Sequence, residues 1–183
     1  KYPCRDMGNG KVRSVGVAMA MQGSGISSVD TAAVEIKLND DGFYTLMIGA
    51  ADMGTGCDTI LAQMAADCLE CDIDNIIVHG VDTDQSPYDT GSYASSTTYI
   101  TGGAVIKTCE KMRKRIIEEA SKALGCSIDN LEFDGKKVFS LVDEKEISLI
   151  DIANNTLVGG FNTISESESH YSEVSPPPDR KST

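Results

Sequence analysis

The stretch VDTDQSPYDTGSYASSTT, residues 81–98, is an unusually long run of small, polar and turn-forming residues. A short apolar run precedes it and a long amphipathic segment follows it. Ordinary connections are only about four to six residues long. Backbone N–H groups in such a loop, beside a helix start, receive a phosphate or another anion well. The stretch therefore predicts an anion-binding loop, although plain helix capping by Ser95, Ser96 and Thr97 explains the same residues equally well.

A second loop, GAADMGTG at residues 49–56, has the same character. It also follows a predicted strand and precedes a predicted helix, and its small side chains let a ligand approach the backbone closely. It lacks the Gly-Lys-Ser/Thr ending of a Walker loop and the spacing of a Rossmann fingerprint. We take these two loops as the candidate binding elements of the chain.

Hydrophobic periodicity predicts the elements around the loops. Alternating or β-branched apolar residues predict strands at 15–21, 32–38, 43–48 and 76–78, with a turn at 39–42 and a later hairpin at 131–133 and 138–141. The strand at 76–78 is expected to be buried, because three β-branched residues follow one another there.

Apolar residues at three- and four-residue spacing predict two main amphipathic helices. One begins near Asp58, and a longer one covers residues 104–124 and ends at Gly125. Ser148 is the expected N-cap of a short helix that runs through residue 154. Mixed sheets and hairpins combined with helices favour an α+β fold.

The chain is expected to divide into a domain portion and a tail. Residues 1–158 carry the periodic pattern, whereas residues 159–183 lose it and are rich in Ser, Glu and Pro. Such composition is typical of an extended, poorly packed linker. The chain begins without a methionine, and we expect it to be a piece of a longer protein.

Composition limits the classes of partner. With 40% hydrophobic and 24% charged residues, the chain is expected to fold as a globular domain. The net charge of −12 argues against nucleic acid and against a membrane surface, because both need a basic face. No apolar run approaches the roughly 18–20 residues of a membrane span, and no signal peptide is recognisable.

Six cysteines lie mostly at apolar positions, which indicates reduced thiols packed as small hydrophobes and a cytoplasmic location. Cys68 and Cys71 form a single C-x-x-C with no second pair and no nearby histidine, so a zinc or iron–sulfur site is not favoured.

The sequence gives little support for other metal-binding or catalytic residues. Asp82, Asp84 and Asp89 lack the spacing of an EF-hand, and Asp at turns commonly caps its own backbone. His79 and His170 are interpreted as structural, and no nucleophile with a partner base is recognisable. We therefore expect neither a protein-ligated metal nor a catalytic residue on this chain.

Taken together, four motifs resemble the molybdenum-binding subunit of the bacterial-type xanthine dehydrogenase/aldehyde oxidase, or molybdenum hydroxylase, family. They stand in the family's order and spacing over roughly residues 15–178, at 49–56, 62–66, 82–95 and 102–105. The resemblance implies the α+β molybdopterin-binding domain of these enzymes.

The resemblance also implies the site residues. Met53 and Gly54, followed by Thr55, match the turn that lies against the molybdopterin cofactor. The second segment, which binds the cofactor through its backbone and hydroxyls, is matched by Ala94, Ser95, Ser96 and Thr97. In this family the pterin sulfurs hold the molybdenum. Many members have Gln in place of Thr55 and Arg in place of Ser96.

For the parent protein, the resemblance implies oxidative hydroxylation of a small molecule (a purine, an N-heterocycle or an aldehyde), with water as the oxygen source. Its partners would be the remainder of the molybdenum subunit and domains or subunits carrying iron–sulfur clusters and FAD. The family's catalytic glutamate lies far downstream of these motifs, so the fragment is expected to be inactive alone. A stand-alone, non-catalytic module for a phosphate-bearing ligand and a purely structural domain are the alternatives.

Overall fold

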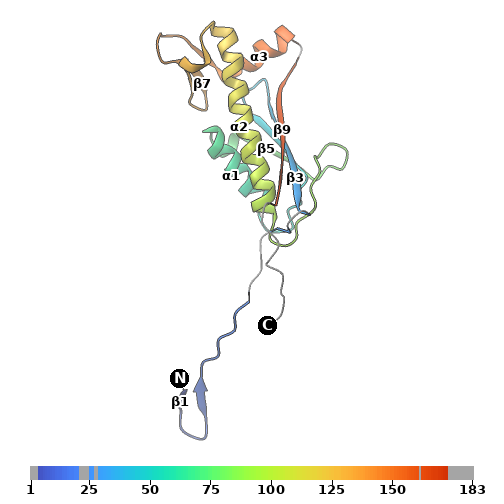
Figure 1. Ribbon diagram of the computed structural model, residues 1–183, viewed down its shortest axis with the longest axis vertical. Coiled ribbons are helices and arrows are strands. Elements are labelled where there is room, and N and C mark those ends of the chain that lie inside the picture. Colours follow the sequence, from blue (N-terminus) through green and yellow to red (C-terminus); the bar gives the residue numbers. More distant parts are fainter. Residues whose placement is uncertain (1–3, 21–24, 27–28, 161, 173–183) are drawn as a thin grey trace, which may run out of the picture.

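A computed structural model describes residues 4–20, 25–26, 29–160 and 162–172 of the chain (Figure 1). Its body has two layers: two long helices lie side by side over one face of a four-stranded sheet. The predicted α+β class is confirmed, because hairpins and one parallel pair combine with helices in this body. Within the described residues, no helix combines the length and apolar character that a membrane crossing requires.

The four-stranded sheet has the order β5-β4-β3-β9. The predicted hairpin forms its centre: β3 (Thr31–Leu38) and β4 (Tyr44–Ile48) are antiparallel, joined by the tight turn at residues 39–42. Strand β5 (Ile76–Gly80) pairs with β4 in parallel, and β9 (Ile164–Tyr171) pairs with β3 in antiparallel fashion.

Alternation along β3 and β4 places one set of side chains against the helices. The buried set includes Val34, Ile36, Leu38, Leu46 and Ile48, all with essentially no exposed surface. Leu61, Val105, Met112 and Ile116 of the helices complete this core. Burial of this contiguous apolar surface is the main stabilising contribution to the fold.

Both predicted amphipathic helices are present, and one is longer than predicted. Helix α1 spans Cys57–Leu69, and α2 spans Thr97–Leu124. Gly125 ends α2 in the left-handed conformation, and its N–H donates to the Ser121 carbonyl at 2.9 Å. Helix α2 therefore begins inside the polar stretch of residues 81–98, before its apolar stripe becomes regular.

A smaller unit covers the carboxyl end of α2. Strands β6 (Leu131–Phe133), β7 (Lys137–Ser140) and β8 (Glu146–Ser148) form an antiparallel sheet, followed by α3 (Leu149–Gly160). The predicted N-cap is confirmed, because the Asp151 N–H donates to Ser148 Oγ at 3.1 Å. Short 3₁₀ turns, Ile73–Asn75 and Ile128–Asn130, precede β5 and β6.

Two strand predictions near the sheet edges are wrong in part. Residues 15–20 of the predicted 15–21 strand have no regular structure and are exposed, and residue 21 lies outside the described residues. The chain instead forms a short exposed hairpin before them, β1 (Cys4–Asp6) with β2 (Val12–Ser14). In β5 only Ile76 is buried, and Ile77 is 50% exposed, because Ile77 lies beside Thr45 on the face of the sheet opposite the helices.

The prediction of a poorly packed segment after residue 158 is wrong for Ile164–Tyr171. This segment is β9, which pairs with β3 over its full length, from Leu38 opposite Ile164 to Thr31 opposite Tyr171. The predicted boundary at residue 158 therefore separates β9 from the sheet to which it belongs. That a tail follows the domain stays a prediction, because residues 173–183 lie outside the described residues.

Strand β9 was not predicted from hydrophobic periodicity because it packs against α2 through polar side chains. The β9 side chains that face α2 include Glu166 and Glu168, whose carboxylates lie 3.7 and 2.9 Å from Lys111 Nζ of that helix. His170 fits against Gly103 of α2, where a Cβ would collide with the imidazole. A strand that packs through carboxylates and an imidazole carries no hydrophobic alternation to detect.

Replacing Ile164 by Ala tests whether β9 belongs to the core. Ile164 is buried opposite Leu38, so Ile164→Ala should lower the free energy of unfolding by about 2–5 kcal/mol. Ser165→Ala, at the exposed neighbouring position, should change it by no more than about 0.5 kcal/mol. Urea denaturation measures both. Equal, negligible effects would mean that this segment is not packed.

Candidate functional site

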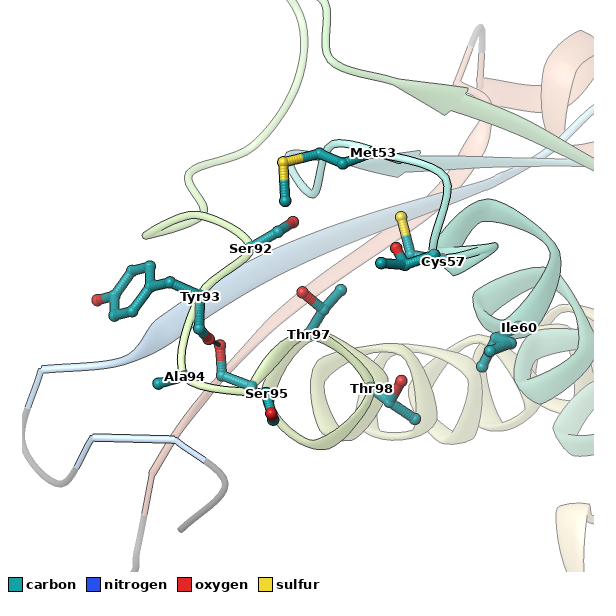
Figure 2. A pocket seen from close by; sticks show the side chains of 11 residues that line it. Met53, Cys57, Ile60, Ser92, Tyr93, Ala94, Ser95, Thr97 and Thr98 are labelled. Atoms are coloured by element: carbon teal, nitrogen blue, oxygen red, sulfur yellow. Dashed lines mark hydrogen bonds between the residues drawn. The ribbon is translucent and has the colours of Figure 1, made fainter. Parts of the chain in front are cut away.

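The two candidate loops lie together and line one cavity of about 470 Å³, here called the two-loop cavity (Figure 2). Of the predicted binding residues, all except Gly54 line it, and Gly54 lies in the same turn between two lining residues. The lining consists of Met53, Thr55, Cys57, Ile60, Ser92, Tyr93, Ala94, Ser95, Ser96, Thr97 and Thr98. The sequence-based site did not include Cys57, Ile60, Ser92, Tyr93 and Thr98. Tyr93 and Thr98 adjoin predicted residues, Ser92 lies in the same loop, and Cys57 and Ile60 belong to the first turn of α1.

Sheet topology explains why loops far apart in the sequence meet. Strands β4 and β5 are parallel neighbours, with Ile48 opposite Gly80 at their carboxyl ends. The chain therefore leaves both strands at the same end of the sheet and continues into residues 49–56 after β4 and residues 81–96 after β5. Each loop then enters a helix, so α1 and α2 both begin at the two-loop cavity.

Both helices begin without a side-chain cap. At α1 the N-cap is Gly56, which has no side chain. At α2 the N-cap is Ser96, but its hydroxyl donates to the Tyr93 carbonyl at 2.7 Å instead of accepting a helix N–H. The first N–H groups of an α-helix have no partner within the helix. Ser96 therefore does not serve as a side-chain cap, and two helix starts border one cavity. The carboxylates of Asp52 and Asp58 lie at the start of α1, so the positive dipole character is less compensated at α2.

The backbone before α2 is strained. Ala94 and Ser95 have φ values of 50° and 54°, a left-handed region that costs a non-glycine residue about 1–2 kcal/mol. The Gly25 N–H donates to the Ala94 carbonyl at 3.1 Å and thereby supports this bend. Strain that the surroundings hold in place commonly marks ligand-binding segments.

Several contacts anchor the 81–96 loop to the body. The Asp89 carboxylate accepts from Gly91 N–H at 2.8 Å and from Thr101 Oγ1 of α2 at 2.9 Å. Gly49 allows the close approach, since a Cβ there would collide with the Pro87 carbonyl oxygen and lie 2.8 Å from Asp89 Cβ. The loop's entry is thereby fixed between the sheet and α2.

Hydrogen bonds also join the two loops to each other and stabilise the turn within the first loop. Ser92 Oγ donates to the Ala51 carbonyl at 3.1 Å, which joins the second loop to the first. Asp52 Oδ1 accepts from the N–H groups of Gly54 and Gly56, at 2.8 and 3.2 Å, and so shapes the turn that carries Met53. These amide hydrogen bonds, Gly54 first, lower the pKa of the exposed Asp52 carboxyl.

The cavity is lined without a lysine or arginine among the described residues. An anion would therefore be held by backbone N–H groups and by hydroxyls such as those of Thr97 and Thr98. Cys57, only 4% exposed, contributes a neutral wall, because burial and the neighbouring Asp58 raise the pKa of its thiol to about 11.

Potential metal ligands can be compared within the described part of the chain. The ligand atoms of Asp52, Cys57 and Asp58 all lie within 4.8 Å of one another, whereas Asp82, Asp84 and Asp89 form no such group. In the first group, Asp52 already accepts two amides, and the Cys57 thiol points to Asp58 Oδ1 at 3.6 Å. Local hydrogen bonds therefore account for these side chains.

The remaining sequence candidates lie elsewhere and have structural contacts. The Asp84 N–H donates to Asp82 Oδ1 at 2.9 Å, as expected for an Asp at a turn. His79 Nε2 lies 3.6 Å from Asp82 Oδ2, and His170 packs edge-on against Tyr99, with ring centroids 5.9 Å apart. Neither histidine lines the two-loop cavity.

Comparison with known proteins gives a consistent family. A sequence model of the molybdopterin cofactor-binding domain matches residues 4–182. The probable hypoxanthine oxidase XdhD of Escherichia coli K12 is 36% identical over 150 residues, 81% of this chain and 16% of that protein. The putative xanthine dehydrogenase molybdenum-binding subunit XdhA of the same organism is 29% identical over 70% of this chain and 17% of that protein.

A solved structure shows the same fold. CO dehydrogenase from Oligotropha carboxidovorans superposes with a TM-score of 0.70 at 22% identity, covering 78% of this chain and 18% of that one. The chain thus spans less than a fifth of the length of these relatives.

On acidification, the turn that carries Met53 should keep its Asp52 hydrogen bonds to a pH below the ordinary pKa of an Asp carboxyl. A carboxyl whose folded pKa is lowered stabilises the fold above its unfolded pKa, and this contribution is lost as pH falls through the folded pKa. In an NMR titration, the amide shifts of Gly54 and Gly56 should therefore change with the Asp52 carboxyl at a pH below the ordinary value of about 3.9. In Asp52→Ala this titration should disappear from both amides. A midpoint at or above the ordinary value would contradict the assigned hydrogen bonds.

Proposed function

The chain belongs to the family of molybdopterin cofactor-binding domains, and on this premise we propose that the two-loop cavity holds part of the molybdopterin of a xanthine dehydrogenase-like molybdenum hydroxylase. The observation that carries the proposal is the convergence of two uncapped helix starts on one cavity lined by both predicted loops. The chain would form one wall of the cofactor site, and other parts of the parent protein would complete it.

The cavity fits a phosphate-bearing, heteroatom-rich cofactor. Helix N-termini attract a phosphate without cationic side chains, and the left-handed pair Ala94 and Ser95 bends the chain just before α2. Met53, Gly54 and Thr55 would hold the cofactor from one side, and Ala94, Ser95, Ser96 and Thr97 from the other. Ser96 would only shape the wall in this proposal, because its hydroxyl and its N–H both donate to the Tyr93 carbonyl.

When bound, the cofactor would supply the redox chemistry, a two-electron hydroxylation of a substrate carbon with oxygen from water. The residues of this chain would bind and orient it and keep water away. Ile60, Ala94 and the largely exposed Met53 provide the apolar contacts for that task. We assign no proton transfer and no catalytic role to a side chain of the cavity.

For the parent protein, we propose hydroxylation of a purine, another N-heterocycle or an aldehyde. The names of relatives support this range, since they include a probable hypoxanthine oxidase and a nicotine 6-hydroxylase large subunit. The general base would be a glutamate outside this chain, so the chain alone would be inactive. Thr55 and Ser96 stand where many family members have Gln and Arg, and these positions would help to set the substrate range.

Partners follow from the same proposal. The redox partners would be iron–sulfur clusters and FAD on other domains or subunits, and the remainder of the molybdenum subunit would cover the two-loop cavity. The free cysteines and the acidic net charge support a cytoplasmic protein that binds neither nucleic acid nor a membrane.

Replacing Thr97 by Glu separates cofactor binding from folding. A carboxylate in the first turn of α2 should leave the helix as stable or stabilise it by about 0.3–1 kcal/mol. The same charge would repel an anionic group in the cavity and should reduce retention of the cofactor on the order of tenfold or more. The measurement is molybdenum content and pterin fluorescence of the purified intact subunit, with unfolding followed in parallel.

Two variants serve as controls for this experiment. Thr97→Gln has similar size without charge and should retain most of the cofactor, and Thr83→Glu places the same charge in the loop away from the cavity lining. Equal cofactor content in Thr97→Glu and Thr97→Gln would overturn the proposed site. Binding of inorganic phosphate by an intact subunit that never contains pterin would instead favour the non-catalytic phosphate-binding module.

A further inference from the structure

Asp30 is a buried acidic residue that lies outside the lining of the two-loop cavity. It directly precedes β3, at the end of the sheet where that cavity lies, and only 1% of its surface is exposed. Within the described part of the chain it forms no ion pair. Burying a carboxylate without a cation is unfavourable unless hydrogen bonds compensate it, so the hydrogen bonds of Asp30 indicate what it does.

The side chain and the backbone of Asp30 both bind Ile26. The Ile26 N–H donates to Asp30 Oδ2 at 2.5 Å, and the Asp30 N–H donates to the Ile26 carbonyl at 3.0 Å. The Ser172 N–H, just beyond β9, donates to the Asp30 carbonyl at 3.0 Å. Asp30 is thereby fixed to the sheet and fixes Ile26 in turn. Residues 25, 26, 29 and 30 are here called the Asp30 turn; residues 27 and 28 lie outside the described residues.

The Asp30 turn carries Gly25, which contacts the loop before α2. The Gly25 N–H donates to the Ala94 carbonyl at 3.1 Å. Gly25 has a φ of 78°, and a Cβ at this position would lie 3.2 Å from Ser172 Oγ and 3.4 Å from Ile100 Cδ1. A residue with a side chain would be strained and crowded there, so glycine lets the Asp30 turn approach the loop this closely.

The Ala94 carbonyl belongs to the peptide group between the two left-handed residues, Ala94 and Ser95. In a trans peptide the N–H points opposite to the C=O, so the Ser95 N–H points away from Gly25. Among the described residues this N–H has no acceptor, and Ser95 lines the two-loop cavity. The hydrogen bond from Gly25 therefore sets the direction of an open amide at the cavity wall.

We propose that Asp30 is a positioning residue of the two-loop cavity, which orients the Ser95 N–H toward a hydrogen-bond acceptor of the bound cofactor. Asp30 holds Ile26 and thereby the adjoining Gly25. The Gly25 N–H holds the Ala94 carbonyl, which fixes the direction of the amide. A left-handed pair with side chains is unfavourable by itself, so the bend needs such support to be preformed. This inference rests on the proposed cofactor function of the cavity.

The test is hydrogen exchange of the intact molybdenum subunit at single-residue resolution, combined with its molybdenum and pterin content. Asp30→Ala leaves the Ile26 N–H without its acceptor, so the Gly25 and Ile26 amides should exchange on the order of tenfold faster than in the wild type. Cofactor content should fall by roughly threefold or more, because the cavity wall is no longer preformed. Asp30→Asn keeps an acceptor oxygen and should restore both slow exchange and cofactor content.

Two variants show whether the effect is more than lost stability. Ile164→Ala removes core packing at the opposite end of β9, so it should destabilise the fold without faster exchange at Gly25 and without loss of cofactor. Ser172→Ala removes a buried hydroxyl that has no hydrogen-bond partner among the described residues, so it should resemble the wild type. Equal loss of cofactor in Asp30→Ala and Ile164→Ala at equal stability would overturn the proposal.

Unchanged exchange in Asp30→Ala, or an Ile26 amide that exchanges freely in the wild type, would also overturn it. If Asp30→Ala does not fold, the wild-type exchange rates and Asp30→Asn decide the question. Faster exchange of the Gly25 and Ile26 amides with undiminished cofactor would confirm that Asp30 holds the turn and would overturn the two-loop cavity as the cofactor site. Failure of the proposed function is thus distinguished from failure of the contact between Asp30 and the loop.

Discussion

Strands β4 and β5 run in the same direction, and Ile48 lies opposite Gly80 where both strands end. This parallel pairing makes two loops leave the sheet at one edge and sends each into a helix that packs back over the core. Had β5 paired in the opposite sense, residues 81–96 would begin at the other end of the sheet. The two-loop cavity, its two open helix starts and the contact between α1 and α2 all depend on this one arrangement.

The energetic balance of the 81–96 loop favours a preformed shape. Left-handed backbone at Ala94 and Ser95 costs about 1–2 kcal/mol per residue. Against it stand the hydrogen bonds of Asp89, those to the Tyr93 carbonyl, and the Gly25 amide bond, each contributing about 0.5–1.5 kcal/mol. The first N–H groups of the helices have no acceptor within the helix, and an anion or water can accept their hydrogen bonds. The anchors offset the strain, and the helix ends stay available for a ligand.

Much of the fold was predictable where side chains alternate or repeat. The hairpin of β3 and β4, the stripes of α1 and α2, and the Ser148 cap follow directly from local chemistry. Strand β9 was not predictable in this way, because it packs through Glu166, Glu168 and His170, whose partners Lys111 and Gly103 lie on α2. The exposure of Ile77 also depends on which face of the sheet the helices cover, and no local pattern records that.

The sequence by itself determined the two candidate loops and the family resemblance, because small residues, turns and motif spacing are local properties of the chain. Only the tertiary structure decided that the loops share one cavity, that Ser96 bonds to Tyr93 instead of capping α2, and that the Cys68 thiol lies against the Ile106 carbonyl of α2. The physical reason is the same in each case. Strand order and helix packing bring residues that are distant in the sequence into contact, and they select one hydrogen-bond partner among several that the local sequence allows.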